Sequence, residues 1–328
     1  MTTRHFCTYF DHNYLPRGVV MLESLHEHCP HAHVHVLCLS EECYAAMTIL
    51  AYPYVSLIRL SELEAVDPDL FATRSTRSLV EYYFTITPCL PWFLLNQKGI
   101  GEITYLDADM MFFSSPEPIF EEAGKASVII TPHRFTPLTK EREELYGIYN
   151  VSWLSFRNTS DGLDCLKWYR DSCLEWCYDI VEENRFADQK YLNEFPERFS
   201  GVHSMRHSGG GVAPWNIGDS IVKMHDDSIM INNEPLIFYH AQHFGHIAGP
   251  FYSSGLLWYQ VKHLSKIAKK HIFLEYAKLY KQAVKKVNKL CKNCKFVSIR
   301  SNNRYESIFY IIKAIRKEWR RGILLTVL

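Results

Sequence analysis

The chain has 328 residues, of which 47% are hydrophobic, and it contains no low-complexity tract. This composition supports one large folded domain with an appendage and excludes a disordered protein. The formal net charge is zero, but residues 262–328 hold 18 of the 36 basic residues and only three of the 36 acidic ones, so an acidic body carries a basic end. No run of 18 apolar residues is present, which excludes an ordinary transmembrane helix.

The ten cysteines follow no framework of the secreted type, and the first residues do not resemble a signal peptide. We therefore expect reduced thiols and a cytoplasmic location. Cys291 and Cys294 have the spacing of half a zinc site, but no second Cys or His pair lies at ligand spacing, so zinc is the weaker interpretation. We expect Cys173 and Cys177, one helical turn apart, to lie in the core.

Strands alternate with helices along the first part of the chain. The predicted elements are strands at 6–9, 34–39 and 55–60 and a helix at 17–28, with Ser40-Glu41-Glu42 as the start of a second helix. Because helices separate successive strands at this spacing, the pattern predicts an α/β fold with a parallel sheet.

The middle of the chain continues this alternation. A helix is predicted over 78–85, where Pro88 and Pro91 are expected to interrupt it, and a short apolar strand at 103–106 runs into Asp107-Ala108-Asp109. The remaining predicted elements are strands at 128–131 and 236–240 and helices at 161–183 and 188–195. Near residue 255 the sequence becomes lysine-rich and helical to its end. We therefore expect a domain at 1–255 and a basic helical extension at 256–328.

The pattern Asp-x-Asp occurs twice. Asp67-Pro68-Asp69 lies in a polar segment, where Asp and Pro are ordinary turn residues. Asp107 and Asp109 instead follow a strand and stand between apolar runs, where two unpaired carboxylates would be costly. A divalent ion with oxygen ligands offsets that cost, and ligands of open α/β sheets gather at the carboxyl ends of strands. A simple turn or a helix cap is the alternative interpretation.

The segment 105–109, Tyr-Leu-Asp-Ala-Asp, closely resembles the metal-binding signature of GT-A-fold glycosyltransferases, especially the glycogenin-like and bacterial galactosyltransferase-like family 8. Further segments resemble this family in its order, so the resemblance covers roughly residues 5–250. They are 8–15 with 22–25 (opening strand, base-binding turn and first helix), 149–152 (sugar-contacting turn), 188–193 (Asp-Gln-x-x-Leu-Asn), 213–216 (Leu-Pro-x-x-x-Asn) and 236–240 (the strand that ends in the third metal ligand).

The resemblance implies a GT-A fold, that is, an α/β fold with a mixed, mostly parallel sheet flanked by helices. It also implies transfer of a sugar from a nucleotide diphosphate, UDP-linked, with retention, to a glycan or lipid-linked acceptor in surface polysaccharide synthesis. Mn²⁺ or Mg²⁺ on Asp107, Asp109 and His240 would stabilise the leaving pyrophosphate. The other implied site residues are Tyr9, Asp11, Asn13, Tyr14, Arg77, Asp107 and Asn150 for the donor, Asp188 and Gln189 for catalysis, and Trp215 and His243 for the acceptor.

Several positions depart from the family pattern. His240, His243 and His246 compete for one ligand position: His240 fits the strand end, whereas His246 fits the literal spacing to the following glycine. The usual Arg after the Tyr pair is missing in 82–85, so Arg77 or Arg74 takes that place. The sugar-contacting turn has a serine where glycine is expected.

Alternatives also remain for single residues. Tyr9 or Tyr14 is expected to stack on the base while Asp11 accepts from its imide, but either Tyr fits a core position equally well. An N-cap is the alternative for Asp188. Residues 209–211, Gly-Gly-Gly, lack the flanking strand and Gly-Lys-Ser/Thr of a phosphate loop, so we expect a flexible loop near the acceptor.

The basic end is predicted to form amphipathic helices. In the last 24 residues, Trp319 and several aliphatic residues lie opposite basic ones, which is typical of a helix on an anionic lipid surface, here the inner face of the membrane. The alternative is a helix packed on the acidic body or on a second subunit of an oligomer. Nucleic acid is not expected as a partner, because aromatic stacking positions are sparse among the basic residues.

Three other classes of protein fit less well. An enzyme of sugar-nucleotide synthesis would have a glycine-rich loop with Arg or Lys after the first strand. The segment 11–14, Asp-His-Asn-Tyr, is not such a loop. A catalytically inactive GT-A-fold scaffold that binds membranes would be favoured by loss of a carboxylate of the Asp-x-Asp motif, and both are present. A dinucleotide oxidoreductase is disfavoured because no Gly-x-Gly-x-x-Gly links a strand to a helix.

Overall fold

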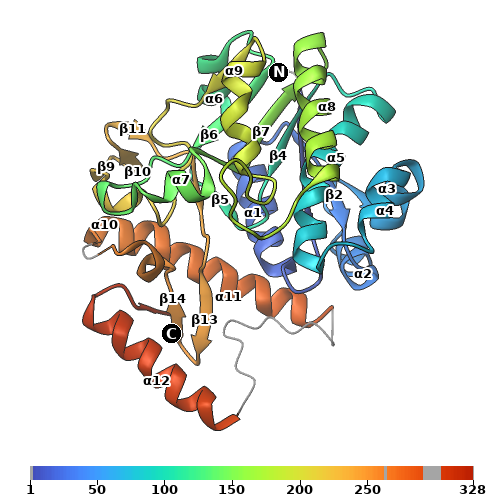
Figure 1. The fold of residues 1–328 in the computed structure, drawn as a ribbon. Helices are drawn as coiled ribbons and strands as arrows, with labels where there is room; N and C mark the ends of the chain where they lie inside the picture. Colours follow the sequence, from blue (N-terminus) through green and yellow to red (C-terminus); the bar gives the residue numbers. More distant parts are fainter. Residues whose placement is uncertain (1–2, 262–263, 291–303, 328) are drawn as a thin grey trace.

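The computed structural model describes residues 3–261, 264–290 and 304–327, so the predicted half zinc site at Cys291 and Cys294 lies outside the described residues. Its main element is a seven-stranded sheet in the order β3-β2-β1-β4-β7-β6-β8 (Figure 1). These strands are β1 (Arg4–Phe10), β2 (Ala32–Cys38), β3 (Val55–Arg59), β4 (Glu102–Leu106), β6 (Val128–Pro132), β7 (Tyr149–Arg157) and β8 (Val202–Ser204). Within this sheet β7 is antiparallel to both of its neighbours and the other pairs are parallel. The predicted α/β fold with a mixed, mostly parallel sheet is confirmed.

Helices cover both faces of the sheet (Figure 1). They are α1 (Leu15–His28), α2 (Glu41–Leu50), α3 (Leu60–Val66), α4 (Pro68–Thr73), α5 (Leu79–Gln97), α6 (Glu117–Ala123), α7 (Arg142–Tyr146), α8 (Ser160–Glu175) and α9 (Phe195–Arg198). Alternate side chains of β1 divide the core, since Phe6 and Phe10 pack with α1 and α6 whereas Cys7 packs with α5 and α8. The sheet is therefore buried on both sides, as parallel sheets usually are.

Three small sheets extend this body. They are β5 (Met110–Phe112) with β12 (Phe238–His240), the meander of β9 (Val222–His225), β10 (Ser228–Ile231) and β11 (Glu234–Pro235), and a three-stranded sheet of β13 (Gly245–Ala248), β14 (Phe251–Ser253) and β15 (Leu325–Thr326). The first of them matters for the site, because it joins the segment after β4 to a strand far along the chain.

Some local predictions are confirmed by the contacts that form them. Ser40 begins α2 as its N-cap, since its hydroxyl accepts from the amide of Cys43 at 3.2 Å. Asp67, in the discounted Asp-x-Asp, caps α4 and pairs with Arg170 at 2.7 Å, so this motif has a structural explanation. Cys173 and Cys177 are fully buried, as expected.

The predicted interruption at Pro88 and Pro91 is wrong. Helix α5 continues through both prolines to Gln97. Each proline lacks an amide donor and costs about 3 kcal/mol in an isolated helix, but most of α5 is buried against α8 and the sheet. Tertiary packing of this kind supplies most of the stability of helices in proteins and outweighs the local preference.

Three further expectations need correction. Helix α8 ends at Glu175 rather than near residue 183, and β7 occupies a stretch for which a turn was expected. The expected flexible loop at Gly209 is instead packed: its carbonyl accepts from the amides of Ile237 and Phe238 at 2.9 and 3.2 Å. A Cβ there would lie 1.8 Å from the carbonyl oxygen of Pro235, so glycine is required for close packing rather than for mobility.

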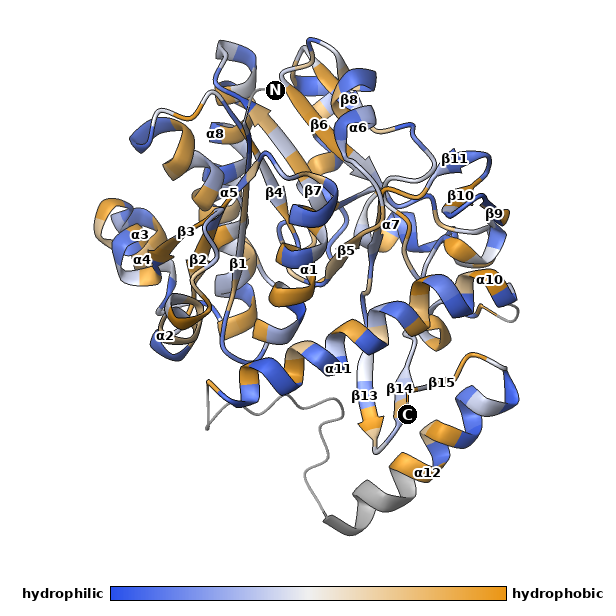
Figure 2. Cartoon of the chain, turned by 180° about the vertical axis from the view of Figure 1, so that it is seen from behind, coloured by the Kyte–Doolittle hydropathy of each residue, from blue (hydrophilic) through white to orange (hydrophobic). Residues whose placement is uncertain are grey.

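The basic end forms α10 (Lys266–Ala268), a π-helical turn at Lys269–Phe273, α11 (Leu274–Asn288) and α12 (Arg304–Arg320). Figure 2 shows hydrophobic and hydrophilic segments alternating along α11. Its hydrophobic side is buried, with Tyr276 fully buried and Tyr280 edge-on against Phe244, and Lys286 pairs with Glu23 of α1 at 2.7 Å. The part of the basic end at α11 therefore packs on the acidic body.

The expectation that the chain is helical to its end is wrong. Strand β15 pairs with β14, and Ile323 and Leu325 are fully buried. Glu318 of α12 is 2% exposed and accepts hydrogen bonds from the hydroxyl of Ser253 and the amide of Ser254. The end of α12 is thus attached to the β13–β14 hairpin. None of the helices in the described ranges is long and apolar enough to cross a bilayer.

Candidate metal and donor site

Asp107 and Asp109 lie in the turn between β4 and β5, at the carboxyl end of a parallel strand, and cap no helix. The amide of Asp107 donates to the carbonyl of Ser152 on β7 at 3.1 Å, so the turn is fastened to the neighbouring strand. The side chain of Asp107 is 21% exposed and that of Asp109 is 9% exposed. Two carboxylates thus stand side by side with little access to water.

His240 reaches the same point from β12, a strand far along the chain. Strand β12 pairs antiparallel with β5 and places His240 opposite Met110, the residue after Asp109. Its Nε2 lies 3.1 Å from Oδ1 of Asp109 and 3.6 Å from Oδ2 of Asp107. The three side chains form one of two clusters within the described part of the chain whose donor atoms lie close enough to hold a metal ion.

The charges of this cluster influence one another strongly. Burial raises the pKa of Asp107 to about 6, aided by the charge of Asp109 and opposed by His240. Burial opposes ionisation of Asp109 as well, but the imidazolium of His240 outweighs it and lowers the pKa. The pKa of His240 is raised because the two carboxylates outweigh the effect of its burial. A cluster of this kind holds a cation most stably when both acids are ionised.

The donor set fits a divalent ion. Two carboxylates and one imidazole suit Mn²⁺ better than Ca²⁺, and Mg²⁺ accepts the carboxylate part of the set. His246 does not take part: it lies on β13, and its Nε2 contacts the carbonyl of Gly249 at 2.9 Å. Of the three competing histidines, His240 is the one that the fold brings to the two aspartates.

Tyr9 connects the end of β1 to this cluster. Its hydroxyl lies 2.9 Å from Oγ1 of Thr87 on α5, and its ring lies 5.5 Å from that of Tyr105. The hydroxyl of Tyr105 in turn donates to Oδ1 of Asp107 at 2.9 Å. Tyr9 therefore belongs to a polar network beside Asp107. It packs against other side chains, as a core residue does, and also lies next to the candidate site.

The turn after β1 is organised by Asp11. Its carboxylate accepts from the amides of Asn13 and Tyr14 at 2.9 and 3.0 Å and from the side-chain amide of Asn13 at 3.0 Å. Asn13 and Tyr14 are exposed, and Arg17 lies 4.5 Å above the ring of Tyr14. Asp11 is thus engaged in shaping the turn, while Tyr14 presents an accessible ring at the strand end.

Asp188 is a buried carboxyl group whose charge is influenced by Thr87 and Asp107. It is 2% exposed, it lies in a turn before the 3₁₀ helix Lys190–Glu194, and it does not serve as the N-cap residue of that helix. Its Oδ2 has no hydrogen-bond partner in the part of the chain that the structure describes. Burial raises its pKa to about 7, with Thr87 opposing the shift and the charge of Asp107 adding to it. An unpaired buried carboxyl group is costly and marks a functional candidate.

Gln189 and Asn150 are both held by backbone groups. The side-chain amide of Gln189 donates to the carbonyl of Tyr146 at 2.8 Å, and that of Asn150 donates to the carbonyl of Thr131 at 3.3 Å. Asn150 also accepts from the amide of Ser152 at 3.1 Å. Ser152, the residue that replaces the expected glycine, is therefore part of the β7 segment that fastens Asp107.

The structure places Arg77 in a different setting from the one expected. Its guanidinium donates to the carbonyls of Leu174 and Glu175 at 3.2 and 3.3 Å and lies 3.9 Å from the ring centre of Tyr178. These contacts join the start of α5 to the end of α8, so they explain Arg77 as a structural residue. Arg74, the other candidate, pairs with Glu64 at 3.1 Å.

The two proposed acceptor residues differ in position. Trp215 is 2% exposed, its indole donates to the carbonyl of His133 at 2.7 Å, and its ring lies edge-on to His240 at 5.3 Å. In this position it packs against the imidazole of His240, and its role towards an acceptor stays a prediction. His243 stacks on Trp258 at 4.8 Å, and Trp258 is 61% exposed, so this pair does present a surface.

Arg17 was not singled out from the sequence. It lies in the first turn of α1, donates to the carbonyl of Phe244 at 2.9 Å, and its charge adds to the effects that lower the pKa of Asp109. A cation at the start of a helix opposes the helix dipole, so its presence there is a signal for another role. Arg17 is therefore a candidate for contact with an anionic group of a ligand.

A groove also lies on the side of Gln189. It is lined by residues of α7 and the loop after α8, among them Leu145, Ile148 and Val181, which are 43–45% exposed. The carbonyl of Tyr146, which holds Gln189, belongs to the same α7 segment. Lys190, the residue after Gln189, also lines the groove.

The fold and the cluster at its strand ends define a class: the chain has the GT-A fold of glycosyltransferases. It superposes on galactosyltransferase LgtC in complex with donor and acceptor sugar analogs with a TM-score of 0.51 and 17% identity, covering 85% of this chain and 95% of LgtC. An active-site mutant of LgtC, with a glutamine changed to glutamate, superposes with a TM-score of 0.50, 16% identity and the same coverage.

The particular family follows from sequence. The chain is 31% identical to the uncharacterised protein YfnD of Bacillus subtilis strain 168 over 262 residues, which are 79% of this chain and 83% of YfnD. It is 30% identical to the uncharacterised protein YfnF of the same organism over 246 residues, 73% of this chain and 80% of YfnF. The chain belongs to the family of YfnD and YfnF. No family model matches it, and membership of glycosyltransferase family 8 stays a prediction.

Proposed function

We propose that this protein is a metal-dependent glycosyltransferase that uses a nucleotide-diphosphate sugar, UDP-linked, and transfers the sugar with retention. The observation that carries the proposal is the convergence of Asp107, Asp109 and His240 at the carboxyl end of β4 in a GT-A fold. In such sheets ligands bind at the carboxyl ends of the strands. The solved neighbour LgtC binds donor and acceptor sugar analogs, which supports the same two classes of ligand here.

Mn²⁺ or Mg²⁺ held by Asp107, Asp109 and His240 would act as a Lewis acid that offsets the charge of the departing diphosphate. The residues around it are suited to hold the donor. Tyr14 offers an exposed ring for the base beside the turn that Asp11 organises, and Arg17 offers a cation for a phosphate oxygen. The donor would thus extend from the end of β1 towards the end of β4.

The reacting sugar would lie near Asp188 and Gln189. Transfer breaks the bond between the anomeric carbon and the diphosphate oxygen, which keeps the electron pair. It forms a bond from that carbon to an acceptor hydroxyl, whose proton passes to the departing diphosphate. A buried carboxylate with an oxygen that lacks a partner, as in Asp188, supports stabilisation of the positive charge that develops on the sugar ring. The side-chain amide of Gln189 donates to the carbonyl of Tyr146, and this fixed orientation supports a role in orienting the sugar.

The groove beside Gln189 is the acceptor site that we propose. Its lining combines the exposed apolar residues Leu145, Ile148 and Val181 with four glutamates, at 143, 144, 182 and 183. This mixed lining supports an acceptor with an apolar and a polar part, such as a lipid-linked glycan of surface polysaccharide synthesis. His243 with the exposed Trp258 offers a second contact for a sugar ring.

We also propose that α12 brings the protein to an anionic lipid surface on the inner face of the membrane. Trp319 is 71% exposed and Ile312 is 43% exposed, although both are large and apolar. The basic residues of the same segment are exposed as well; they are Lys313, Arg316, Lys317, Arg320 and Arg321. Exposed aromatic and basic groups on one helix match an interfacial helix.

A panel of nucleotide-sugars tests the proposal. The thermal unfolding of the full chain is followed with each compound, with and without Mn²⁺. A ligand at 100 times its dissociation constant stabilises the folded state by about 2.7 kcal/mol, so a cognate donor raises Tm only when Mn²⁺ is present. Product stereochemistry by proton NMR then tests retention. If no nucleotide-sugar raises Tm with Mn²⁺, the donor assignment is wrong.

A further inference from the structure

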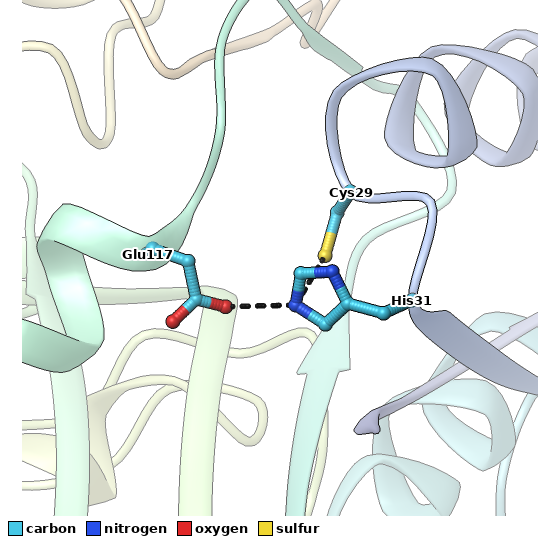
Figure 3. Close-up of side chains that lie close together, drawn as sticks. All are labelled: Cys29, His31 and Glu117. Carbon is cyan, nitrogen blue, oxygen red and sulfur yellow. Dashed lines mark hydrogen bonds and ion pairs between the residues drawn. The ribbon is translucent and has the colours of Figure 1, made fainter. Parts of the chain in front are cut away.

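A second cluster of metal-binding groups lies at the opposite end of the sheet (Figure 3). Cys29 directly follows α1, His31 directly precedes β2, and Glu117 is the first residue of α6. The Nε2 atom of His31 lies 3.6 Å from Sγ of Cys29 and 3.1 Å from Oε1 of Glu117. All three donor atoms lie within 4.8 Å of one another.

This cluster is separate from the donor site. Arg4, at the start of β1, contacts both Glu117 and Glu102, the first residue of β4, at 2.7 and 3.5 Å. Asp107 follows the last residue of β4. Five residues of strand span about 16 Å, so the two clusters lie at opposite ends of the same strand.

Hydrogen bonding does not account well for the arrangement. A neutral imidazole nitrogen carries either one proton or one lone pair and makes one good hydrogen bond. Here the thiol of Cys29 and the carboxylate of Glu117 both approach the same Nε2 of His31. Cys29 is fully buried, so its sulfur lacks water as an alternative partner. A cation between the three atoms would satisfy all of them at once.

The distances match a tetrahedral ion. With Zn–S near 2.3 Å and Zn–N or Zn–O near 2.0 Å, tetrahedral angles separate sulfur from nitrogen by about 3.5 Å and nitrogen from oxygen by about 3.3 Å. The observed separations of 3.6 and 3.1 Å agree with these values within the tolerance expected for a metal site. Thiolate, imidazole and carboxylate are also the ligands that zinc takes in proteins.

Arg4 has the position of a supporting residue. Its Nε donates to Oε1 of Glu117 at 3.0 Å and its Nη2 donates to Oε2 at 2.7 Å, which fixes the plane of the carboxylate. Oε1 keeps a second lone pair directed to His31. The charge of Arg4 is shared with Glu102, so it is balanced by a carboxylate outside the cluster.

We propose that Cys29, His31 and Glu117 bind one divalent ion of the zinc class, with water as the fourth ligand. The side chains of His31 and Glu117 are 22% and 30% exposed, which gives the ion and a water access from solvent. The ion ties the end of α1 and the start of β2 to the first turn of α6. This site is independent of sugar transfer and of the ion at Asp107.

The test uses Co²⁺ alone as the probe, added to the full chain after removal of metal. Cys291 and Cys294 are replaced by serine in every sample, so that this pair contributes no thiolate. A thiolate bound to Co²⁺ gives a charge-transfer band in the near ultraviolet, which the oxygen and nitrogen ligands at Asp107 do not give. The parent is expected to show the band at one equivalent of Co²⁺, and Zn²⁺ is expected to displace it.

Variants then identify the ligands. Cys29→Ala is expected to lose the band, His31→Gln to weaken the Kd for Co²⁺ at least tenfold, and the buried control Cys165→Ala and the donor-site variant Asp109→Asn to keep both. No band in the parent, or an unchanged band in Cys29→Ala, overturns the proposal. If Cys29→Ala does not fold, the partly exposed His31→Gln decides, and an unchanged Kd in that variant overturns the proposal.

Discussion

The Nε2 atom of His240, at the end of β12, lies 3.1 Å from Oδ1 of Asp109, which lies in the turn before β5, far away in the chain. The backbone fixes this contact. Strand β12 pairs with β5, and the amide of Ala241 donates to the carbonyl of Asp109 at 2.9 Å. The imidazole therefore reaches the carboxylates because of strand pairing, and it does not depend on a mobile loop.

This relationship predicts which histidine binds metal. His240→Ala should weaken the Kd for Mn²⁺ at least about tenfold, equivalent to about 1.4 kcal/mol, because it removes the one imidazole beside both aspartates. His246→Ala should leave that Kd unchanged, because its Nε2 contacts the carbonyl of Gly249. Titration of both variants with Mn²⁺ by calorimetry provides the comparison. An equal loss in both, or a loss confined to His246→Ala, would contradict the assignment.

The sequence predicts the parts of the site that follow continuous strands. Asp11 and Asp107 come directly after apolar segments that form β1 and β4, and strand ends of a parallel sheet share an edge. The pairing of β12 with β5 is a long-range contact, so sequence spacing alone does not decide which of His240, His243 and His246 is the third metal ligand. For the same reason the antiparallel strand β7 and the closing strand β15 were not predicted, since their partners lie far away in the chain.

Burial explains the remaining differences. Pro88 and Pro91 lie inside α5 because packing on both sides outweighs the lost hydrogen bonds. Trp215, which the family resemblance assigns to the acceptor, is buried against His240. Arg77 has carbonyl partners at the end of α8, which residue type alone does not reveal. Each of these outcomes depends on neighbours that are distant in sequence.

Asp188 is predicted to combine a functional role with a cost in stability. Its pKa is about 7 in the folded protein against about 3.8 when unfolded, so the unfolded state binds fewer protons between these values. Stability from this group is therefore lost as the pH rises from 4 to 7. Asp188→Asn should raise the free energy of unfolding above that of the parent by roughly 4 kcal/mol at most at pH 8, and by much less at pH 4, while sugar transfer falls.

Thermal unfolding at pH 4 and pH 8, with transfer assays at pH 8, measures both effects. Asp69→Asn is the control, since the side chain of Asp69 is 76% exposed. A variant at Asp188 that loses stability at pH 8, or that keeps full activity, would show that this carboxyl group has a structural role only.

Arg17 is predicted to hold the donor. Arg17→Gln should raise KM for the nucleotide-sugar about tenfold or more, because the positive charge of Arg17 acts on Asp109 and is available to an anionic donor. The Kd for Mn²⁺ without nucleotide should not weaken, since removing a neighbouring positive charge favours a cation. Steady-state kinetics and metal titration separate the two effects. An unchanged KM would contradict a role in donor binding and would leave Arg17 a structural role, its hydrogen bond to the carbonyl of Phe244.

The role of α12 in lipid binding has to be tested without removing the end of the chain, because Ile323 and Leu325 belong to the core. Trp319→Ala combined with Arg320→Glu and Arg321→Glu changes exposed residues only. Binding to anionic vesicles should fall by at least tenfold, since each basic residue near such a surface contributes about 1 kcal/mol. Sedimentation with anionic and neutral vesicles measures this binding. Undiminished binding of the triple variant to anionic vesicles would contradict a lipid-binding role of α12.

The most direct test concerns the two aspartates themselves. UDP release from the donor identified by the nucleotide-sugar panel is measured with and without Mn²⁺ for the parent, Asp107→Asn, Asp109→Asn and the control Asp69→Asn from the second Asp-x-Asp. The first two variants should lose at least about 100-fold in Mn²⁺-dependent release with little change in Tm, and the control should match the parent. Mn²⁺-dependent release that persists in both Asp107→Asn and Asp109→Asn would contradict the account.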